Sequence, residues 1–420
     1  MKVAVIGAGI SGISAAEYLS EHCEVTLFDK EDRVGGHADT QTIEIDGDTI
    51  NVDTGFIVFN PENYPRFYEL INKYNVNYQD SDMSFAVSNR LSGLEYNATS
   101  IKQLFCQKKN LLNPKFYRMI MDITRFYREA GELLKPEYPT PEISLGDYLA
   151  QNHYGDYFIH EHIIPMASAL WSGEADLIME FPAKYLVSFM NNHKMMQVSE
   201  RPVWKTITGG SKQYLKAITK QAAFKVRLGA VIKTIKRKDD TVTLVLDSSE
   251  ERFDAVILAC HSDQALKLLE QPSTLEDEVL SAIRYQKNEI CLHWDERCLP
   301  KNRQAWASWN VIKDGKHTDK CTVSYYMNLL QSLPTEIPVI VSLNMNEDID
   351  PSKVWKYIEY DHPVYTQATI DAQRKRSLIQ GQNNTYFCGA YWGWGFHEDG
   401  ARSGLEAAKE LLSSINHVTE

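Results

Sequence analysis

Residues 1–12 read MKVAVIGAGISG, and the chain from there to Asp29 decides the fold. The run from Val3 to Ile6 is short and wholly apolar, which is typical of a strand buried on both faces. A glycine turn follows at G-x-G-x-x-G spacing, then a helix-like segment, and then a strand-like run, 25–28, that ends at Asp29. This order predicts a βαβ unit that binds a dinucleotide.

Each residue of the turn has its own physical task. Gly7 allows the tight turn, Gly9 lets a pyrophosphate approach the backbone, and Gly12 lets helix and strand pack closely. Ile10 and Ser11, between the last two glycines, are assigned to the same site. The helix-like segment 13–21 follows, and its free N–H groups and positive dipole end face the phosphates. The turn therefore predicts a phosphate site at the start of this helix.

The second strand ends in an acid that suits a ribose. Asp29 can accept hydrogen bonds from the hydroxyls of an adenosine ribose, and we place Lys30 in the same site. Because the charge of Asp29 would repel a 2′-phosphate, NADP is a poor candidate.

A second glycine pair follows within a few residues, in the stretch RVGGH at 33–37. It resembles the GG motif of flavoproteins of the amine-oxidase superfamily, in which the motif contacts the FAD pyrophosphate. The stretch VDTGF at 52–56 resembles the D-x-G segment that lies near the flavin ring in that superfamily. The resemblance implies FAD as cofactor and assigns to it Gly35, Gly36, His37, Thr54, Gly55 and Phe56.

Composition narrows the class of protein. A chain of 420 residues exceeds one typical core, so we expect two lobes. The formal net charge of -12 argues against a nucleic-acid-binding protein. The 7 cysteines have no C-x-x-C spacing, which favours reduced thiols over disulfides or zinc. With no signal peptide or membrane span expected, the favoured location is the cytoplasm, with the inner face of the membrane as an alternative.

The pattern along the chain predicts an α/β protein. We expect a discontinuous Rossmann-type FAD-binding domain and an α+β substrate domain, arranged as in the amine oxidases. Segments 1–60, 201–270 and 381–420 are assigned to the FAD-binding domain, and segments 61–200 and 271–380 to the substrate domain. Strand-like alternation at 226–235 and 241–246 predicts paired strands, and the resemblance places an adenine contact at the backbone of Val231.

One predicted helix of the substrate domain, 115–128, mixes aromatic residues with arginines. Asn113 and Pro114 provide its N-cap and first-turn proline. Such a helix could lie on an anionic membrane surface. The favoured reading is a lobe helix whose arginines are solvated.

A glycine-rich, aromatic stretch at 386–404 forms the second signature. It predicts a strand that ends at Cys388, a turn, and a helix that begins near Gly400 with its N-terminus toward the flavin. It resembles the closing motif of the same superfamily, with one acid more than usual. The resemblance assigns to the cofactor Gly389, Glu398, Asp399, Gly400 and Ala401.

The substrate site is expected beside this turn. His397 and Glu398 are candidates for a general base, although the favoured reading is that the acids order the turn and His397 packs nearby. The stretch His160-Glu161-His162 lacks a convincing third ligand, so no metal is predicted. The aromatic residues expected to line the substrate pocket are Trp171, Tyr391, Trp392, Trp394 and Phe396.

Longer motifs point to one subfamily. GGHADT, SDMSF, LFCQKKNLLNP, IIPMASALWS, RPVW and GFHEDG resemble predicted FAD/NAD-binding proteins of the amine-oxidase superfamily. A similar module precedes plant cyclopropane-fatty-acid synthases, and bacterial relatives include fatty-acyl dehydrogenases. The resemblance implies an apolar or lipid substrate, and as a partner it implies a methyltransferase similar to those synthases.

Four functions remain open at this point. The leading one is an FAD-dependent oxidoreductase that desaturates a modified or unsaturated acyl chain by hydride transfer to flavin N5. The others are a fatty-acid double-bond isomerase, an amine oxidase, and a non-catalytic flavoprotein partner of a lipid-modifying enzyme. Fold alone does not separate them.

Overall fold

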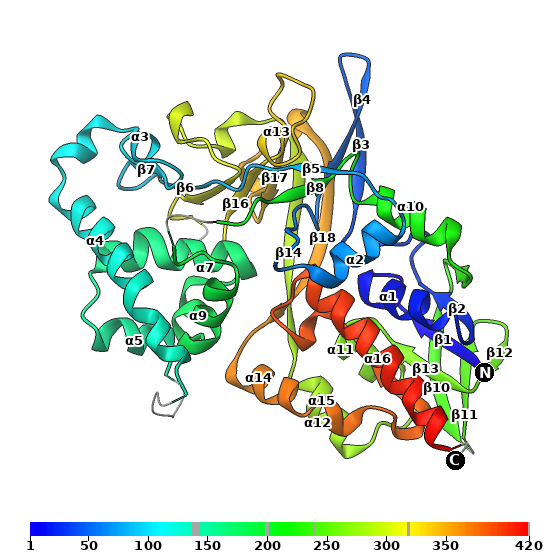
Figure 1. Cartoon of the computed structure of the whole chain (residues 1–420). Helices are drawn as coiled ribbons and strands as arrows, with labels where there is room; N and C mark the ends of the chain where they lie inside the picture. Colours follow the sequence, from blue (N-terminus) through cyan, green and yellow to red (C-terminus); the bar gives the residue numbers. More distant parts are fainter. Residues whose placement is uncertain (137–142, 198–200, 239, 317–319, 419–420) are drawn as a thin grey trace.

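The protein has two lobes built around two separate sheets (Figure 1). The computed structural model describes residues 1–136, 143–197, 201–238, 240–316 and 320–418. The chain passes several times between the lobes, as the sequence colours in Figure 1 show.

A five-stranded sheet in the order β19-β13-β1-β2-β9 forms the centre of the first lobe. All of its neighbouring strands run parallel. The strands of such a sheet are buried on both faces, which explains the continuous apolar run at the N-terminus. The strands are β1 (Lys2–Ile6), β2 (Glu24–Phe28), β9 (Lys225–Arg227), β13 (Ala255–Leu258) and β19 (Thr385–Phe387).

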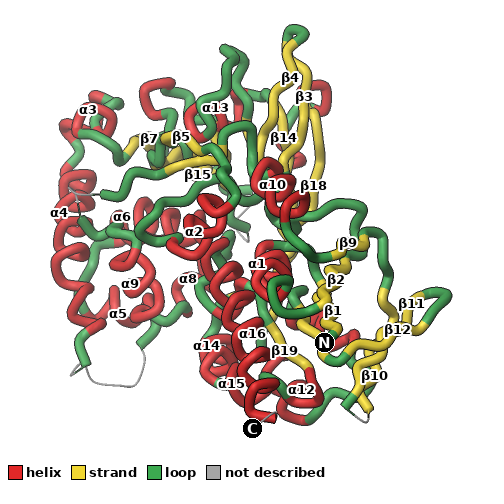
Figure 2. The backbone as a smooth tube through the Cα atoms, turned by 45° about the vertical axis from the view of Figure 1, so that its right-hand side comes forward, coloured by secondary structure: helices red, strands yellow, loops and turns green. Residues whose placement is uncertain are grey.

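Helices cover one face of this sheet and a small antiparallel sheet lies against the other. On the first face, α1 (Ile10–Leu19) packs beside α16 (His397–Val418), as both Figures 1 and 2 show. The same core includes residues of α2 (Pro65–Lys73) and α10 (Lys212–Gln221). The opposite face packs against β10 (Ile232–Lys238), β11 (Thr241–Leu246), β12 (Glu250–Phe253), α11 (Ser262–Leu268) and α12 (Thr274–Ser281).

The second lobe contains a seven-stranded sheet in the order β18-β14-β17-β16-β15-β6-β7. Its pairs are antiparallel except for β15 with β6. Its strands are β6 (Phe85–Asn89), β7 (Leu94–Asn97), β14 (Arg284–His293), β15 (Trp309–Lys313), β16 (Val323–Tyr326), β17 (Ile340–Leu343) and β18 (Val354–Val364).

A group of helices lies to one side of this sheet (Figure 2). Their buried aromatic and methionine side chains join those of the sheet in one large core. The helices are α3 (Ile101–Leu104), α4 (Pro114–Glu129), α5 (Leu145–Gln151), α6 (Asp156–Phe158), α7 (Ile164–Trp171), α8 (Ala175–Glu180) and α9 (Ala183–Asn192), with the 3-10 helix η1 (Lys108–Leu112) between α3 and α4.

A buried acid ties the two lobes together at the hairpin β3 (Thr40–Ile45) and β4 (Asp48–Asp53). The Asp53 carboxylate accepts hydrogen bonds from Ser211 N–H at 2.9 and 3.0 Å and from Thr40 Oγ1 at 2.5 Å. It also accepts one from Gln331 Nε2 of the second lobe at 2.9 Å. Burial raises the pKa of Asp53 to about 6.

Several predicted boundaries are wrong in detail. The predicted strand 226–235 divides into β9, which joins the parallel sheet, and β10, which pairs with β11, so Val231 lies in the connection between them. The last helix begins at His397 rather than near Gly400. The long strand β18 was not anticipated. The five predicted domain segments stay a prediction.

The structure also bears on the expected state of the cysteines and on the expected lack of a membrane-spanning helix. All 7 cysteines are free thiols. Among the helices of the described chain, none is both long and apolar enough to cross a membrane.

Candidate functional site

The glycine turn between β1 and α1 has the geometry that its spacing predicts. Gly7 has a φ of +108°, and its N–H donates to Phe28 O at 2.8 Å. A Cβ on Gly12 would lie 1.8 Å from Gly7 O, so only glycine allows α1 to pack this closely. Gly9 differs, because a Cβ there would approach Gly35 O no closer than 4.0 Å. One side of Gly9 therefore faces open space.

The acid after β2 holds the turn in place. Asp29 Oδ2 accepts the Ala8 N–H at 2.7 Å, and its other oxygen accepts the Glu31 N–H at 3.0 Å. Val231 lies close by, because the preceding residue Ala230 donates its N–H to Asp29 O at 2.8 Å. Lys30 points into solvent, with Nζ 4.0 Å from Glu31 Oε1.

The second glycine loop lies directly against the first. Gly35 N–H donates to Ala8 O at 2.8 Å, and a Cβ on Gly36 would lie 3.3 Å from Gly9 Cα. The loop continues to His37, whose carbonyl oxygen accepts the Phe56 N–H at 2.8 Å. The structure thus brings together the two predicted phosphate loops and the 54–56 segment.

The N-terminus of α16 meets that of α1 at the same place. A Cβ on Gly400 would lie 2.6 Å from Ile10 Cγ2 and 3.0 Å from Ser11 Oγ, and Ala401 is buried beside them. Gly389 is fixed by Ser403, whose Oγ accepts its N–H at 2.9 Å. The predicted cofactor residues of the C-terminal signature therefore lie next to those of the N-terminal turn.

Three observations fit a bound pyrophosphate and flavin. In the described part of the chain no side chain caps α1, and its first turn carries no acid. Its N–H groups are thus left for an anion. The open side of Gly9 gives that anion room. His37 Nε2 is buried and has no partner among the described residues, which leaves a polar atom for a ligand.

His397 and Glu398 have partners within the fold. The His397 ring stacks on Phe56 with ring centroids 3.7 Å apart, and its Nε2 is 3.0 Å from Tyr214 Oη. Burial lowers the pKa of His397 to about 3, so the ring is neutral. The Glu398 carboxylate accepts the N–H groups of Arg66 and Phe67, both at 3.0 Å, at the start of α2. Burial raises the pKa of Glu398 to about 7.

The contacts of His397 and Glu398 hold the C-terminal turn in position. Asp399 has a similar task, because its carboxylate accepts the N–H groups of Trp394 and Phe396 at 3.0 and 3.1 Å and pairs with Arg402 at 3.1 Å. The general-base role of His397 or Glu398 stays a prediction.

The predicted aromatic pocket forms in part. Trp171 Nε1 donates to Trp394 O at 3.0 Å, and its ring centroid lies 6.3 Å from that of Phe396. Phe189 of α9 completes the cluster, stacked on Phe396 at 4.8 Å. These four rings belong to the core of the second lobe or pack against it.

Tyr391 and Trp392 do not join that cluster, and their assignment to the substrate pocket stays a prediction. Both are buried in the core between the parallel sheet and α12. The 3-10 helix Ala390–Trp392 turns their side chains inward, whereas Trp394 and Phe396 leave the turn toward the second lobe.

A small pocket opens beside Trp171, between the helices and β14 and β18. Its volume is about 20 Å³, so a ligand there requires side chains to move. None of the described residues that line it carries a permanent charge. They are Trp171, Gly173, Leu177, Ile178, Phe181, Gln286, His362, Pro363, Val364 and Tyr365.

His362, the one titratable imidazole in this lining, is held neutral and in one tautomer. Burial lowers its pKa to about 4. Asn344 Oδ1 accepts the Glu289 N–H at 3.0 Å, so Asn344 Nδ2 donates to Asn288 Oδ1 at 2.9 Å. Asn288 Nδ2 in turn donates to His362 Nδ1 at 3.0 Å. The proton of the ring therefore resides on Nε2, which makes His362 a donor at that atom.

A larger pocket, of about 420 Å³, lies far from this chemistry, near the end of α16. It is lined by hydroxyl, amide and charged groups such as Lys409, and its Glu410 already pairs with Arg376 at 2.8 Å. The site is therefore better defined by the glycine loops and the aromatic cluster.

Comparison with known proteins supplies the class. A model of the flavin-containing amine oxidoreductases matches residues 10–328. The chain belongs to this family. FAD is accordingly its cofactor, and the protein is an FAD-dependent oxidoreductase.

Three known proteins illustrate how similar the chain is to others, each at low sequence identity. An L-amino-acid oxidase of Pseudechis australis is 24% identical over 371 residues, which are 83% of this chain and 67% of that protein. Cyclohexylamine oxidase from Brevibacterium oxydans has a TM-score of 0.69 at 16% identity, covering 99% of both chains. A fatty acid isomerase from P. acnes that produces CLA has the same TM-score and identity over 97% of both chains. These two likenesses show the fold.

Some residues of the site were missed from the sequence. Phe189 was not among them, because its helical patch reads most simply as core and alternatively as the lining of a pocket for a flexible apolar ligand. Gln286 and His362 were missed, because they come from strands whose register alone brings them to the pocket. In the stretch His160-Glu161-His162, two of the three side chains have partners within the fold. His162 Nδ1 is 3.0 Å from Tyr96 Oη, and Glu161 accepts from Asn89 at 2.8 Å. The described residues contain no cluster that suits a metal ion.

Proposed function

We propose that this flavin amine oxidoreductase dehydrogenates an uncharged, apolar substrate, namely an unsaturated, methylated or cyclopropanated fatty-acyl chain. The observation that carries the proposal is the lining of the pocket beside Trp171, which is aromatic and aliphatic with a neutral histidine. A buried charge on the substrate would need a charged partner there, and the described lining offers none.

Aromatic rings suit the charge that develops during such a reaction. Bound FAD, held by the two glycine loops and the N-terminus of α16, would supply a hydride acceptor, and a substrate carbon that gives up a hydride becomes electron-poor. An allylic or cyclopropyl-adjacent carbon delocalises that charge, and ring faces attract it. Trp171, Phe189 and Phe396 supply such faces. Loss of a proton from the neighbouring carbon then completes the new double bond, so two electrons and two hydrogens leave the substrate.

His362 and Gln286 give this pocket a polar end. His362 offers the Nε2–H that its tautomer fixes, and Gln286 Nε2 is engaged by Ser172 O at 2.8 Å. The hydroxyl of Tyr365 lies in the same lining and can also donate, so the neutral donors of this pocket suit the carbonyl oxygen of an acyl group.

The lysine next to this pocket in sequence also points away from it. Lys287 Nζ pairs with Glu359 at 2.7 Å, and its side chain is 71% exposed. An amine oxidase often has a lysine that holds a water molecule near flavin N5, and none of the described residues that line the pocket is a lysine. The amine-oxidase reading is therefore the weaker one for this chain.

The test is anaerobic mixing of the purified holoprotein with unsaturated and cyclopropanated fatty acids or their thioesters, and separately with primary amines and L-amino acids. Loss of flavin absorbance with an acyl substrate, and a product two hydrogens lighter, is the expected result. A product of unchanged mass would indicate double-bond isomerisation, the reaction of one structural neighbour. Bleaching by amines or amino acids alone would overturn the proposal.

A substitution at Trp171 tests whether the pocket takes part in flavin reduction by the acyl substrate. Trp171→Phe keeps a ring against Phe189 but loses the hydrogen bond to Trp394 O. We expect the rate of flavin reduction by the acyl substrate to fall by about tenfold, since the cluster loosens. Val203→Ser, at an exposed site outside the pocket, is the control and should leave the rate unchanged.

A further inference from the structure

Large apolar side chains are exposed at one end of the second lobe, on α3, η1 and the first turns of α4. Ile101 is 80% exposed and Leu112 is 90% exposed, which is far beyond a usual surface position for such residues. Leu111 and Met121 are 50% and 59% exposed. Isolated exposed apolar residues are common, but a group of them marks an interaction surface.

The same end of the lobe is basic in an acidic protein. Between residues 96 and 121 the sequence contains no Asp or Glu, whereas the whole chain has a formal net charge of -12. We define the basic-apolar patch as these cations together with the exposed apolar residues Ile101, Leu111, Leu112 and Met121. The cations of the patch are Lys102, Lys108, Lys109 and Lys115, since Arg118 pairs with Asp122 at 3.5 Å.

Contacts beneath the surface hold the patch in one conformation. Tyr117 Oη donates to Leu111 O at 3.1 Å, which ties η1 to α4. Phe105 packs against Tyr117 with ring centroids 5.7 Å apart. The Asn113 side chain caps α4 by accepting the Lys115 N–H at 3.1 Å. The exposed residues are therefore presented on a folded support.

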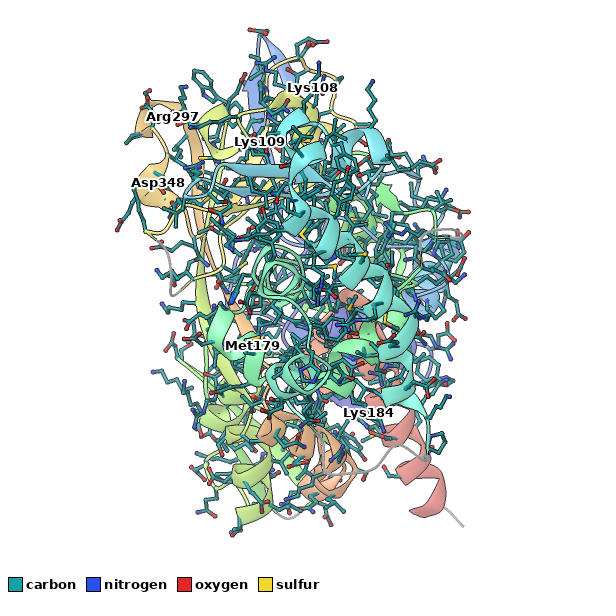
Figure 3. All side chains as sticks on the ribbon, turned by 90° about the vertical axis from the view of Figure 1, so that its left-hand side faces the viewer. Lys108, Lys109, Met179, Lys184, Arg297 and Asp348 are labelled. Atoms are coloured by element: carbon teal, nitrogen blue, oxygen red, sulfur yellow. The ribbon has the colours of Figure 1, made fainter. Side chains whose placement is uncertain are left out.

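The apolar face of α4 itself is turned inward. Phe116, Met119 and Phe126 are buried in the core of the lobe. The apolar side chains available for contact come instead mainly from α3 and η1, just before α4. Figure 3 looks onto this side of the molecule, with Lys108 and Lys109 labelled in its upper part, away from Lys184 below.

We propose that the basic-apolar patch docks the protein on an anionic lipid surface. Charge complementarity favours this occupant, because the cations gather around the protruding apolar residues and the rest of the acidic protein would be repelled. Ile101 and Leu112 project from the fold, so they can enter the interface between headgroups and acyl chains while the lysines stay at the phosphates. The inference holds whatever substrate the site accepts.

The experiment measures binding of the full-length holoprotein to vesicles by co-sedimentation. Vesicles of phosphatidylcholine with phosphatidylglycerol are compared with vesicles of phosphatidylcholine alone. We expect binding to the anionic vesicles that weakens steeply between 50 and 500 mM salt, because screening shortens the reach of the lysines. Equal binding to both kinds of vesicle, or binding to neither, would overturn the proposal.

Variants locate the surface. Lys108→Glu with Lys109→Glu should weaken binding by about tenfold or more, and Ile101→Ser with Leu112→Ser by a similar factor. The matched controls are Lys216→Glu with Lys220→Glu on α10, and Leu378→Ser, which is 53% exposed elsewhere. Equal losses in the patch variants and the controls would show a non-specific charge effect and refute the patch. Flavin absorbance and melting temperature check that each variant is folded.

Discussion

Gly9 and Gly12 lie one helical turn apart, yet a methyl group meets different surroundings at each. At Gly9, where φ is -74°, an alanine Cβ enters the open side of the turn. We expect Gly9→Ala to fold with an unchanged melting temperature of the apoprotein, because no protein atom is displaced. It should bind FAD at least about tenfold more weakly, because the methyl group occupies the path of the pyrophosphate. Flavin fluorescence after gel filtration measures the loss.

Gly12→Ala is the matched comparison. Its Cβ would overlap Gly7 O, so the apoprotein itself should lose about 1–3 kcal/mol of unfolding free energy. If Gly9→Ala were destabilised as strongly as Gly12→Ala, the open side of Gly9 would not be the cofactor's place.

Glu398 gives the protein a defined pH response. Its folded pKa is about 7 against an ordinary value of 4.5, because burial disfavours the carboxylate. The folded state thus binds the proton more tightly than the unfolded state. This contribution to stability is fully present below pH 4.5 and is lost as the pH rises through 7. Relative to Glu398→Gln, the wild-type unfolding free energy should fall by up to roughly 3 kcal/mol across that window.

Chemical denaturation of both proteins at pH 4.5, 6 and 8 measures the difference. Asp53 has a pKa raised in the same direction, and the comparison with Glu398→Gln removes its contribution because both proteins retain it. A difference that stays constant, or that rises with pH, would contradict the burial of the Glu398 carboxyl group.

At the scale of elements, α1 and α16 pack closely enough to share the cofactor site. A Cβ on Gly404 would lie 2.1 Å from Ser11 O, a backbone atom that cannot move without moving α1. We expect Gly404→Ala to separate the two helix N-termini, with a loss of about 1–3 kcal/mol in unfolding free energy and weaker FAD binding. Calorimetry and flavin content measure the two effects. Ser413→Ala, on the exposed side of α16, should change neither.

Elements with strong local signals were predictable from the sequence. The β1-α1-β2 unit follows from a buried apolar run, glycines with steric tasks and a terminal acid, and α4 from its Asn113 cap and the periodic burial of Phe116 and Met119. Each signal acts between residues close in the chain, so sequence alone contains it.

Elements that depend on distant partners were not predictable to the same degree. The strand β18 reads as mixed polar and aromatic because it is an edge strand against β14 alone, and its His362 reaches the pocket only through that register. Trp392 and Trp394 lie in different cores, because a 3-10 turn separates them. Trp392 packs near α12 and Trp394 packs against Phe189, so these distant partners, rather than the tryptophans themselves, set the direction of the turn. The predicted phosphate loops came together because both follow strands of one parallel sheet.

At the scale of the whole molecule, Asp53 connects the two lobes, because its carboxylate accepts hydrogen bonds from Ser211 of the first lobe and Gln331 of the second. If Asp53→Asn replaces Oδ2, the new NH₂ group faces the N–H of Ser211 and the Nε2 of Gln331, and if it replaces Oδ1, the NH₂ group faces the donors of Ser211. We expect a loss of about 1–3 kcal/mol in unfolding free energy, since at least one buried donor loses its acceptor. The melting temperature of the holoprotein measures it. Asp46→Asn, at the exposed tip of the same hairpin, is the control.

The strands of the parallel sheet are spread over distant parts of the sequence, so they emerge from the ribosome at different times. Its central strands β1 and β2 emerge early, β13 is made more than 200 residues later, and the edge strand β19 ends at Phe387. During synthesis, one edge of β1 in the first βαβ unit therefore stays unpaired until its partner strand β13 has been translated. After incubation with FAD and removal of the free flavin, a ribosome-stalled chain that stops before β19 should retain no flavin, and a chain extended past α16 should retain it.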